Sequence, residues 1–195
     1  AFTAKLAILI QLTCLLQNKL KLGQQLVSQS AQAVTDILQS VVRREIKALA
    51  TRIKDKDHIF VVGRSLSYPI ALETALKIKE VSYIHAEAYA GGELKHGPIA
   101  LIDQGTPCIV IAQNDQSYSD SISGAHEMKA RGGYIIAISS KSDPVFDLHL
   151  QVPDLKQATG IPITAVAQLL AYDLAVARGL NPDKPRNLAK SVTVK

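Results

Sequence analysis

The densest group of side chains that could do chemistry begins at residue 73. Glu73, Lys77 and Glu80 are spaced by four and three residues, which places them on one face of a helix. A carboxylate beside a lysine can take up and return a proton, as a general acid and base does. The same spacing is also typical of an exposed ladder of ion pairs, which contributes little to stability. Taken alone, the three residues fit both interpretations.

A second cluster follows directly along the chain. The segment from Tyr83 to Pro98 contains two histidines, two glutamates and three glycines. His85 and His96 are too far apart for one helical face, no cysteine accompanies them, and Pro98 interrupts the regular ligand spacing of a zinc site. We therefore expect acid–base chemistry in this segment, with no metal and no cofactor.

A short turn upstream is a candidate anion site. The run His58–Val62 is apolar and β-branched, which predicts a buried strand, and the turn from Gly63 to Ser67 follows it. In an open parallel sheet, ligands collect beyond the carboxyl ends of the strands. Arg64 and two serine hydroxyls before a helix could hold an anion, or the hydroxyls could simply cap that helix. The composition of the turn favours neither anion binding nor helix capping.

The elements that must position these residues alternate between strands and helices. Further apolar runs predict strands over 108–112 and 134–138, a weaker one over 148–152, and a last helix over 161–178. Parallel strands need crossover helices between them. The sequence therefore predicts an α/β fold, a three-layer flavodoxin-like domain with a central, mostly parallel sheet.

Helices are expected before this domain. Dense apolar residues predict a helix over 2–21, buried on most sides and ended by Gly23, and an amphipathic helix over 28–53. The apolar stretch 6–16 resembles a signal-peptide core, but no cleavage site follows it and it is too short to cross a membrane. We expect 1–54 to be N-terminal helices, 55–180 the α/β domain and 181–195 an irregular tail.

Composition narrows the class of protein further. Of the 195 residues, 47% are hydrophobic and 20% are charged, so the chain can bury one core and is not disordered. The net charge of +5 comes from scattered Lys and Arg residues, which favours small anionic ligands over nucleic acid. Cys14 and Cys108 lie in apolar surroundings, which predicts free buried thiols in the reducing cytoplasm.

Two motifs read together indicate a family. The run GRSLSYPIALETALKIKEVSYIHAEAYAGGELKHGP and the terminal PRNLAKSVTVK resemble the isomerase domain of the glutamine:fructose-6-phosphate aminotransferase family. This domain is built from two sugar-isomerase (SIS) subdomains, and the resemblance extends over essentially the whole chain, as the second of them and its tail. It implies that Glu80 moves a proton between C1 and C2 of the sugar, that His96 opens the ring, and that Lys190 engages the open-chain ketone. Lys77 and Arg64 match residues that line the same substrate site.

The resemblance also implies partners. It predicts conversion of fructose 6-phosphate, with ammonia from glutamine, to glucosamine 6-phosphate in a homodimer in which His96 serves the neighbouring subunit. The phosphate-gripping Ser/Thr loop of the first SIS subdomain and a glutaminase domain are expected upstream, so the chain alone is expected to be inactive. Ser65 departs from the family, which more often has glycine there.

Two rival functions share the fold. One is an SIS-type glucosamine-6-phosphate deaminase, against which the tail PRNLAKSVTV favours the aminotransferase. The other is a non-catalytic domain that senses phosphosugars. The joint presence of Glu80, His96 and Lys190, without a legible DNA-binding helix, counts against a sensor.

Overall fold

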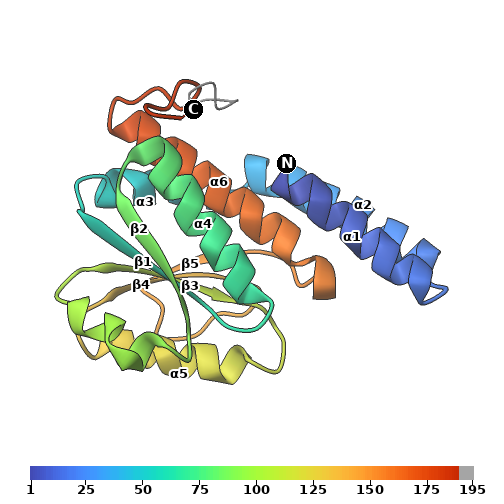
Figure 1. Ribbon diagram of the computed structural model, residues 1–195, viewed down its shortest axis with the longest axis horizontal. Coiled ribbons are helices and arrows are strands. Elements are labelled where there is room, and N and C mark those ends of the chain that lie inside the picture. Colours follow the sequence, from blue (N-terminus) through green and yellow to red (C-terminus); the bar gives the residue numbers. More distant parts are fainter. Residues whose placement is uncertain (189–195) are drawn as a thin grey trace, which may run out of the picture.

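A five-stranded parallel sheet forms the centre of the protein, which the computed structural model describes over residues 1–188 (Figure 1). Its strands are β1 (His58–Gly63), β2 (His85–Ala90), β3 (Pro107–Ala112), β4 (Tyr134–Ser139) and β5 (Leu148–Gln151). They lie in the order β2-β1-β3-β4-β5, and every neighbouring pair is parallel. This is the flavodoxin-like order, so the predicted fold class is confirmed.

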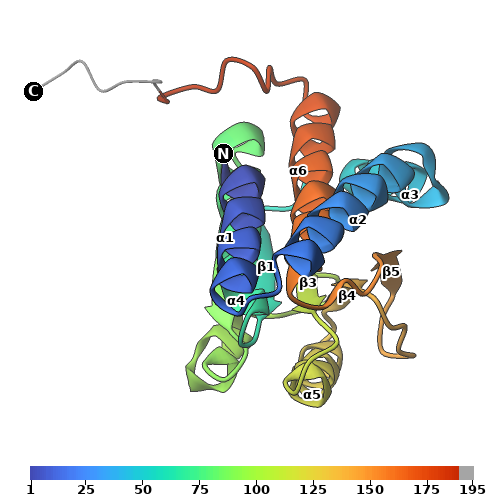
Figure 2. The same ribbon diagram turned by 90° about the vertical axis from the view of Figure 1, so that its right-hand side faces the viewer.

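Helices cover both faces of the sheet, which is why its central strands are apolar on both sides. On one face the residues of β1, β3 and β4 pack against α3 (Val41–Ile53), α4 (Ser67–Ser82) and α6 (Gly160–Ala177). On the other they pack against α5 (Tyr118–Lys129) and the short turns η1 (Leu94–His96) and η2 (Pro98–Leu101). Figure 2 shows these three layers from the side.

The last helix is the most buried one. The stretch Lys156–Ala177, which includes the turn η3 (Lys156–Ala158) and α6, is long and apolar enough to cross a membrane by length and composition. However, 72% of its most apolar window is buried inside the protein. Its apolar character is explained by its place in the core, between α3 and α4.

The N-terminal helices differ from the prediction. The first helix, α1 (Phe2–Leu16), ends before Gly23, which lies inside α2 (Leu20–Gln39) and does not terminate a helix. A Cβ on Gly23 would lie only 2.9 Å from Cβ of Cys14, so this glycine allows α1 and α2 to pack closely. The expected helix over 28–53 is broken at Ser40, which is extended and caps α3 by accepting a hydrogen bond from Val42 N.

The burial expected of the first helix was also wrong. Within α1 only Ile10 is buried, while Ile8, Leu9, Leu12, Leu15 and Leu16 are exposed. The structure also contains a strand that the sequence did not predict, β2, whose run His85–Ala90 alternates small apolar and polar residues at the edge of the sheet. The other predicted strands and the predicted last helix are confirmed.

Candidate active site

The strand order creates a switch point between β1 and β3, where the chain leaves neighbouring strands toward opposite faces of the sheet. The turn Gly63–Ser67 follows β1 there, and Gln113 and Asn114 follow β3. Two hollows open at these carboxyl ends. One of about 410 Å³ is lined by Arg64, Ser65, Tyr68, Gly91, Gly92 and Ser117, among others. One of about 170 Å³ is lined by Leu66, Asn114, Asp154 and Gln157, among others.

Arg64 is held in place by the loop after β2. Its Nη2 donates a hydrogen bond to the carbonyl oxygen of Gly91 at 2.9 Å. A Cβ on Gly91 would lie 2.7 Å from Cγ of Arg64, so the guanidinium arm lies directly against this glycine. Its Nε is buried and has no hydrogen-bond partner among the described residues. Arg64 therefore lines the larger hollow as a cation that the loop after β2 holds in place.

The hydroxyls of Ser65 and Ser67 do not cap α4. No side chain caps the start of α4. The Ser67 hydroxyl instead accepts a hydrogen bond from Gln113 N at 3.3 Å and ties the turn after β1 to the end of β3. Ser65 has φ of +49°, in the left-handed region that favours glycine over other residues.

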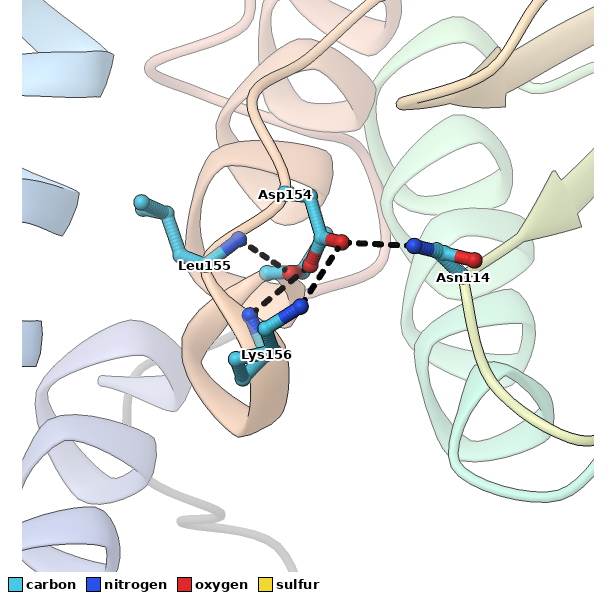
Figure 3. Close-up of polar contacts among 5 residues, drawn as sticks. Asn114, Asp154, Leu155 and Lys156 are labelled. Carbon is cyan, nitrogen blue, oxygen red and sulfur yellow. Dashed lines mark hydrogen bonds and ion pairs between the residues drawn. The ribbon is translucent and has the colours of Figure 1, made fainter.

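The smaller hollow is bordered by an ordered polar network (Figure 3). The carboxylate of Asp154 accepts hydrogen bonds from Asn114 Nδ2 at 2.7 Å and from Lys156 N at 3.0 Å. These bonds, first that from Asn114, lower the pKa of Asp154 below its ordinary value because they stabilise the charged form. The next backbone amide, Leu155 N, donates to Thr159 Oγ1 at 2.8 Å. Sequence reasoning missed this network, whose signal was polar residues placed directly after predicted strands.

Glu80 and Lys77 lie on α4, as the helical spacing predicted. Lys77 Nζ forms an ion pair with Glu80 Oε2, and its distance to Glu73 Oε1 is 3.9 Å. The side chains of Lys77 and Glu80 are 29% and 30% exposed, and that of Glu73 is 15% exposed. The three residues therefore form the ladder that the spacing indicated, but in a partly buried setting.

The described part of the tail docks beside the same helix end. Tyr83 closes α4 in a left-handed conformation, and its hydroxyl accepts a hydrogen bond from Arg186 N at 2.7 Å. The Arg186 guanidinium carbon lies 4.2 Å from the centre of the Tyr83 ring, in cation–π geometry. Figure 2 shows this part of the tail running from the end of α6 past the end of α4. Lys190, the third predicted catalytic residue, lies outside the described residues.

His96 is not brought near Glu80 within the chain. It lies in η1, where its side chain is 70% exposed and its Nδ1 is 2.9 Å from Oε2 of Glu93. It follows the carboxyl end of β2, whereas Glu80 precedes the amino end of that strand. Because a six-residue strand spans roughly 17 to 20 Å, Glu80 and His96 lie at opposite ends of the sheet.

The two cysteines are free, as predicted, but only one is buried. Cys108 is fully buried in β3, and burial raises the pKa of its thiol to about 12. Cys14 is half-buried between α1 and α2. A thiol with so high a pKa is not a nucleophile at neutral pH, so Cys108 has a packing role.

Comparison with known proteins fits this architecture. The sequence profile of the SIS domain matches residues 52–178. The chain belongs to the SIS domain family. It is 41% identical over 204 residues to the glutamine–fructose-6-phosphate aminotransferase (isomerizing) of Chlorobaculum tepidum, covering 100% of this chain and 33% of that relative. The chain thus spans about a third of the length of that curated relative.

Solved structures share this fold. The C-terminal domain of the glucosamine-fructose-6-phosphate aminotransferase from Francisella tularensis superposes with a TM-score of 0.77 at 35% identity, covering 86% of this chain and 48% of that one. The glucosamine-6-phosphate deaminase from Thermotoga maritima superposes with a TM-score of 0.70 at 25% identity, covering 97% of this chain and 56% of that one.

Proposed function

We propose that this chain is the isomerase portion of an enzyme that converts fructose 6-phosphate and glutamine-derived ammonia to glucosamine 6-phosphate. The observation that carries the proposal is 41% identity across the whole chain to a relative named for this reaction. On this proposal, 55–180 is the second SIS subdomain, 1–54 leads into it from the first, and 181–195 is a catalytic tail. A glutaminase domain lies further upstream, and the enzyme works in the cytoplasm.

Glu80 is proposed as the base. Turning a 2-ketose imine into a 2-amino aldose requires one group that takes a proton from C1 and returns it to C2. The ion pair with Lys77 supports this role, because it places an acceptor beside a cation that could stabilise charge developing on the substrate oxygen. The partial burial of both side chains leaves them accessible to a sugar.

The docked tail supports a role for Lys190. Arg186 is held against Tyr83, which is three residues and therefore about 4.5 Å along the helix axis beyond Glu80. Four further residues of chain can span at most roughly 13 to 14 Å. This length of chain allows Lys190 to reach Glu80, as a nucleophile must when it engages the carbon next to the one the base attacks.

The separation of Glu80 from His96 supports a shared site. Two groups at opposite ends of one sheet do not act on the same small sugar, so His96 is proposed to serve the neighbouring subunit of a homodimer. A two-fold axis then gives each site one Glu80 and one His96 from different subunits. Arg64 lies at the same end of the sheet as His96, so it and the hollow that it lines are proposed to contact the sugar phosphate in the site that His96 serves.

The test is an assay of the purified full-length protein with fructose 6-phosphate and glutamine. We expect glucosamine 6-phosphate and glutamate in equal amounts, and no turnover by the isolated 195-residue chain, which lacks the phosphate-gripping loop. A protein that ignores glutamine but releases ammonia from glucosamine 6-phosphate would instead be a deaminase, as the similarity to the Thermotoga structure allows. Phosphosugar binding without turnover of either substrate would indicate a sensor.

A further inference from the structure

Two histidines meet at the amino ends of neighbouring strands. His58 is the first residue of β1 and His85 the first residue of β2, and the two are register partners in the parallel pair. Their Nδ1 atoms are 3.2 Å apart. The rings are nearly perpendicular, at 85°, with centres 5.4 Å apart. Both residues are exposed, and neither takes part in the proposed reaction.

The contact constrains the protons on the pair. A hydrogen bond between two Nδ1 atoms needs one ring that donates N–H and one that accepts with its lone pair. If the donor ring moves its proton to Nε2, both Nδ1 lone pairs point into the space between the rings. No proton is gained or lost in this change, because it exchanges one neutral tautomer for the other.

The distance fits two ligands of one metal ion. Nitrogen ligands at about 2.0–2.1 Å from a tetrahedral zinc lie roughly 3.3 Å from each other. The observed 3.2 Å between the Nδ1 atoms is close to this value, and rotation of the two exposed rings would turn both lone pairs toward one ion. Both histidines begin strands that are hydrogen-bonded to each other, so the backbone already holds them at the spacing that a metal requires.

We propose that His58 and His85 bind a zinc ion, or another late first-row divalent ion, through their Nδ1 atoms. Imidazole ligands suit zinc, nickel and copper, and they do not suit magnesium or calcium. Among the described residues no group of three or more His, Cys, Asp or Glu side chains is placed to hold a metal, so water or another molecule completes the coordination. The ion is therefore exchangeable, unlike one in a closed four-ligand structural site.

Such an ion would tie the edge strand of the sheet to its neighbour. His85 lies two residues after Tyr83, which holds the tail through Arg186. A metal that binds only the folded protein stabilises it by mass action. Zinc is therefore expected to raise the melting temperature, and a chelator is expected to reverse this rise.

Zinc titration of the tag-free full-length protein by isothermal calorimetry tests the site. We expect a zinc-binding step that is weakened at least tenfold in both His58→Ala and His85→Ala. His126→Ala is the control. His126 is another exposed histidine, on α5 and away from the pair, so its removal should leave the titration unchanged. An anomalous diffraction peak at the zinc edge between the two rings would place the ion directly.

Two results would overturn the proposal. One is the absence of zinc binding at millimolar concentration in the wild-type protein. The other is binding that persists at full strength in both alanine variants, which would assign the metal to other residues. His85→Gln keeps a polar side chain at the edge strand, so loss of zinc binding with an unchanged metal-free melting temperature in this variant separates ligation from misfolding.

Discussion

The two ends of the sheet are built differently. At the carboxyl ends, side chains are fixed by bonds to backbone and to neighbouring loops, as in the contacts of Arg64 with Gly91 and of Asp154 with Lys156. At the amino ends, side chains meet in partly exposed pairs, such as Lys77 with Glu80 and the ring of Tyr83 with Arg186. Open α/β sheets usually place their chemistry at the carboxyl ends. Here the candidate base lies at the other end.

On the proposed assignment, one chain does not hold a complete active site. The carboxyl ends hold Arg64, fixed by Gly91, whereas the amino ends hold the proposed base, Glu80. A complete site then requires another subunit or another domain to supply what each end lacks.

Removing the proposed base should have the largest effect. In the full-length enzyme, Glu80→Gln keeps the shape of the side chain but cannot accept the C1 proton, so we expect kcat to fall by about 10² to 10⁴. The matched control is Glu73→Gln, on the same helical face and 3.9 Å from the same lysine, which should lose little activity. Steady-state kinetics of both variants measure kcat. An equal loss of kcat in both would mean that Glu80 is only part of an ion-pair ladder.

Mixing inactive subunits should restore part of the activity. After exchange between equal amounts of Glu80→Gln and His96→Ala subunits, half of the dimers are mixed, and each holds one site with both groups intact. We therefore expect about a quarter of the wild-type activity per site. If demonstrated exchange yields no recovery, the two ends of the sheet do not serve different subunits.

Loosening the tail should have a smaller effect. Tyr83→Ala removes both the hydroxyl that accepts from Arg186 N and the ring beneath its guanidinium. Because contacts of these two kinds are each worth about 1 kcal/mol, and about 1.4 kcal/mol is tenfold, we expect kcat of the full-length enzyme to fall about five- to thirtyfold. Tyr172→Ala, which truncates a half-exposed tyrosine on α6, is the control. Unchanged kcat in Tyr83→Ala would mean that this contact does not position the tail.

Relieving backbone strain should have the smallest effect. Ser65 has φ of +49°, so Ser65→Gly is expected to stabilise the protein by about 0.5–1 kcal/mol, seen as a higher urea midpoint. Ser119→Gly, in the first turn of α5, should shift the midpoint in the opposite direction because glycine disfavours helix. A lower midpoint for Ser65→Gly would show that the serine hydroxyl contributes more than the strain costs.

Most of the fold could be predicted because it rests on local patterns. The strands β1, β3 and β4 are apolar on both faces, and such runs between helical segments indicate a parallel sheet wherever they occur. The edge strand β2 lacked that signal because Glu87 and His85 are exposed there. The helix break at Ser40 was also missed, since a serine cap looks like any other polar residue of an amphipathic helix.

The sequence supplied candidate site residues but little of their arrangement. Helical spacing placed Lys77 beside Glu80, because positions three apart on a helix are neighbours in any fold. Contacts between residues far apart in the sequence leave no such spacing signal. Arg64 with Gly91 and Asn114 with Asp154 depend on which strands lie next to each other. The contact of Tyr83 with Arg186 depends on where the tail crosses the helix.

The histidines show most clearly what the sequence determined and what the tertiary structure determined. The sequence by itself specified an α/β chain with Glu80 and Lys77 on one face of a helix, because side-chain periodicity reports local geometry. It set His85 and His96 in one segment, too far apart for a helical face, and predicted no metal site there. The tertiary structure instead places His85 beside His58, 27 residues away in the sequence. His96 lies beyond the opposite end of β2, the strand that begins at His85. Only strand order and register decide such contacts, because parallel pairing sets residues side by side that no local spacing connects.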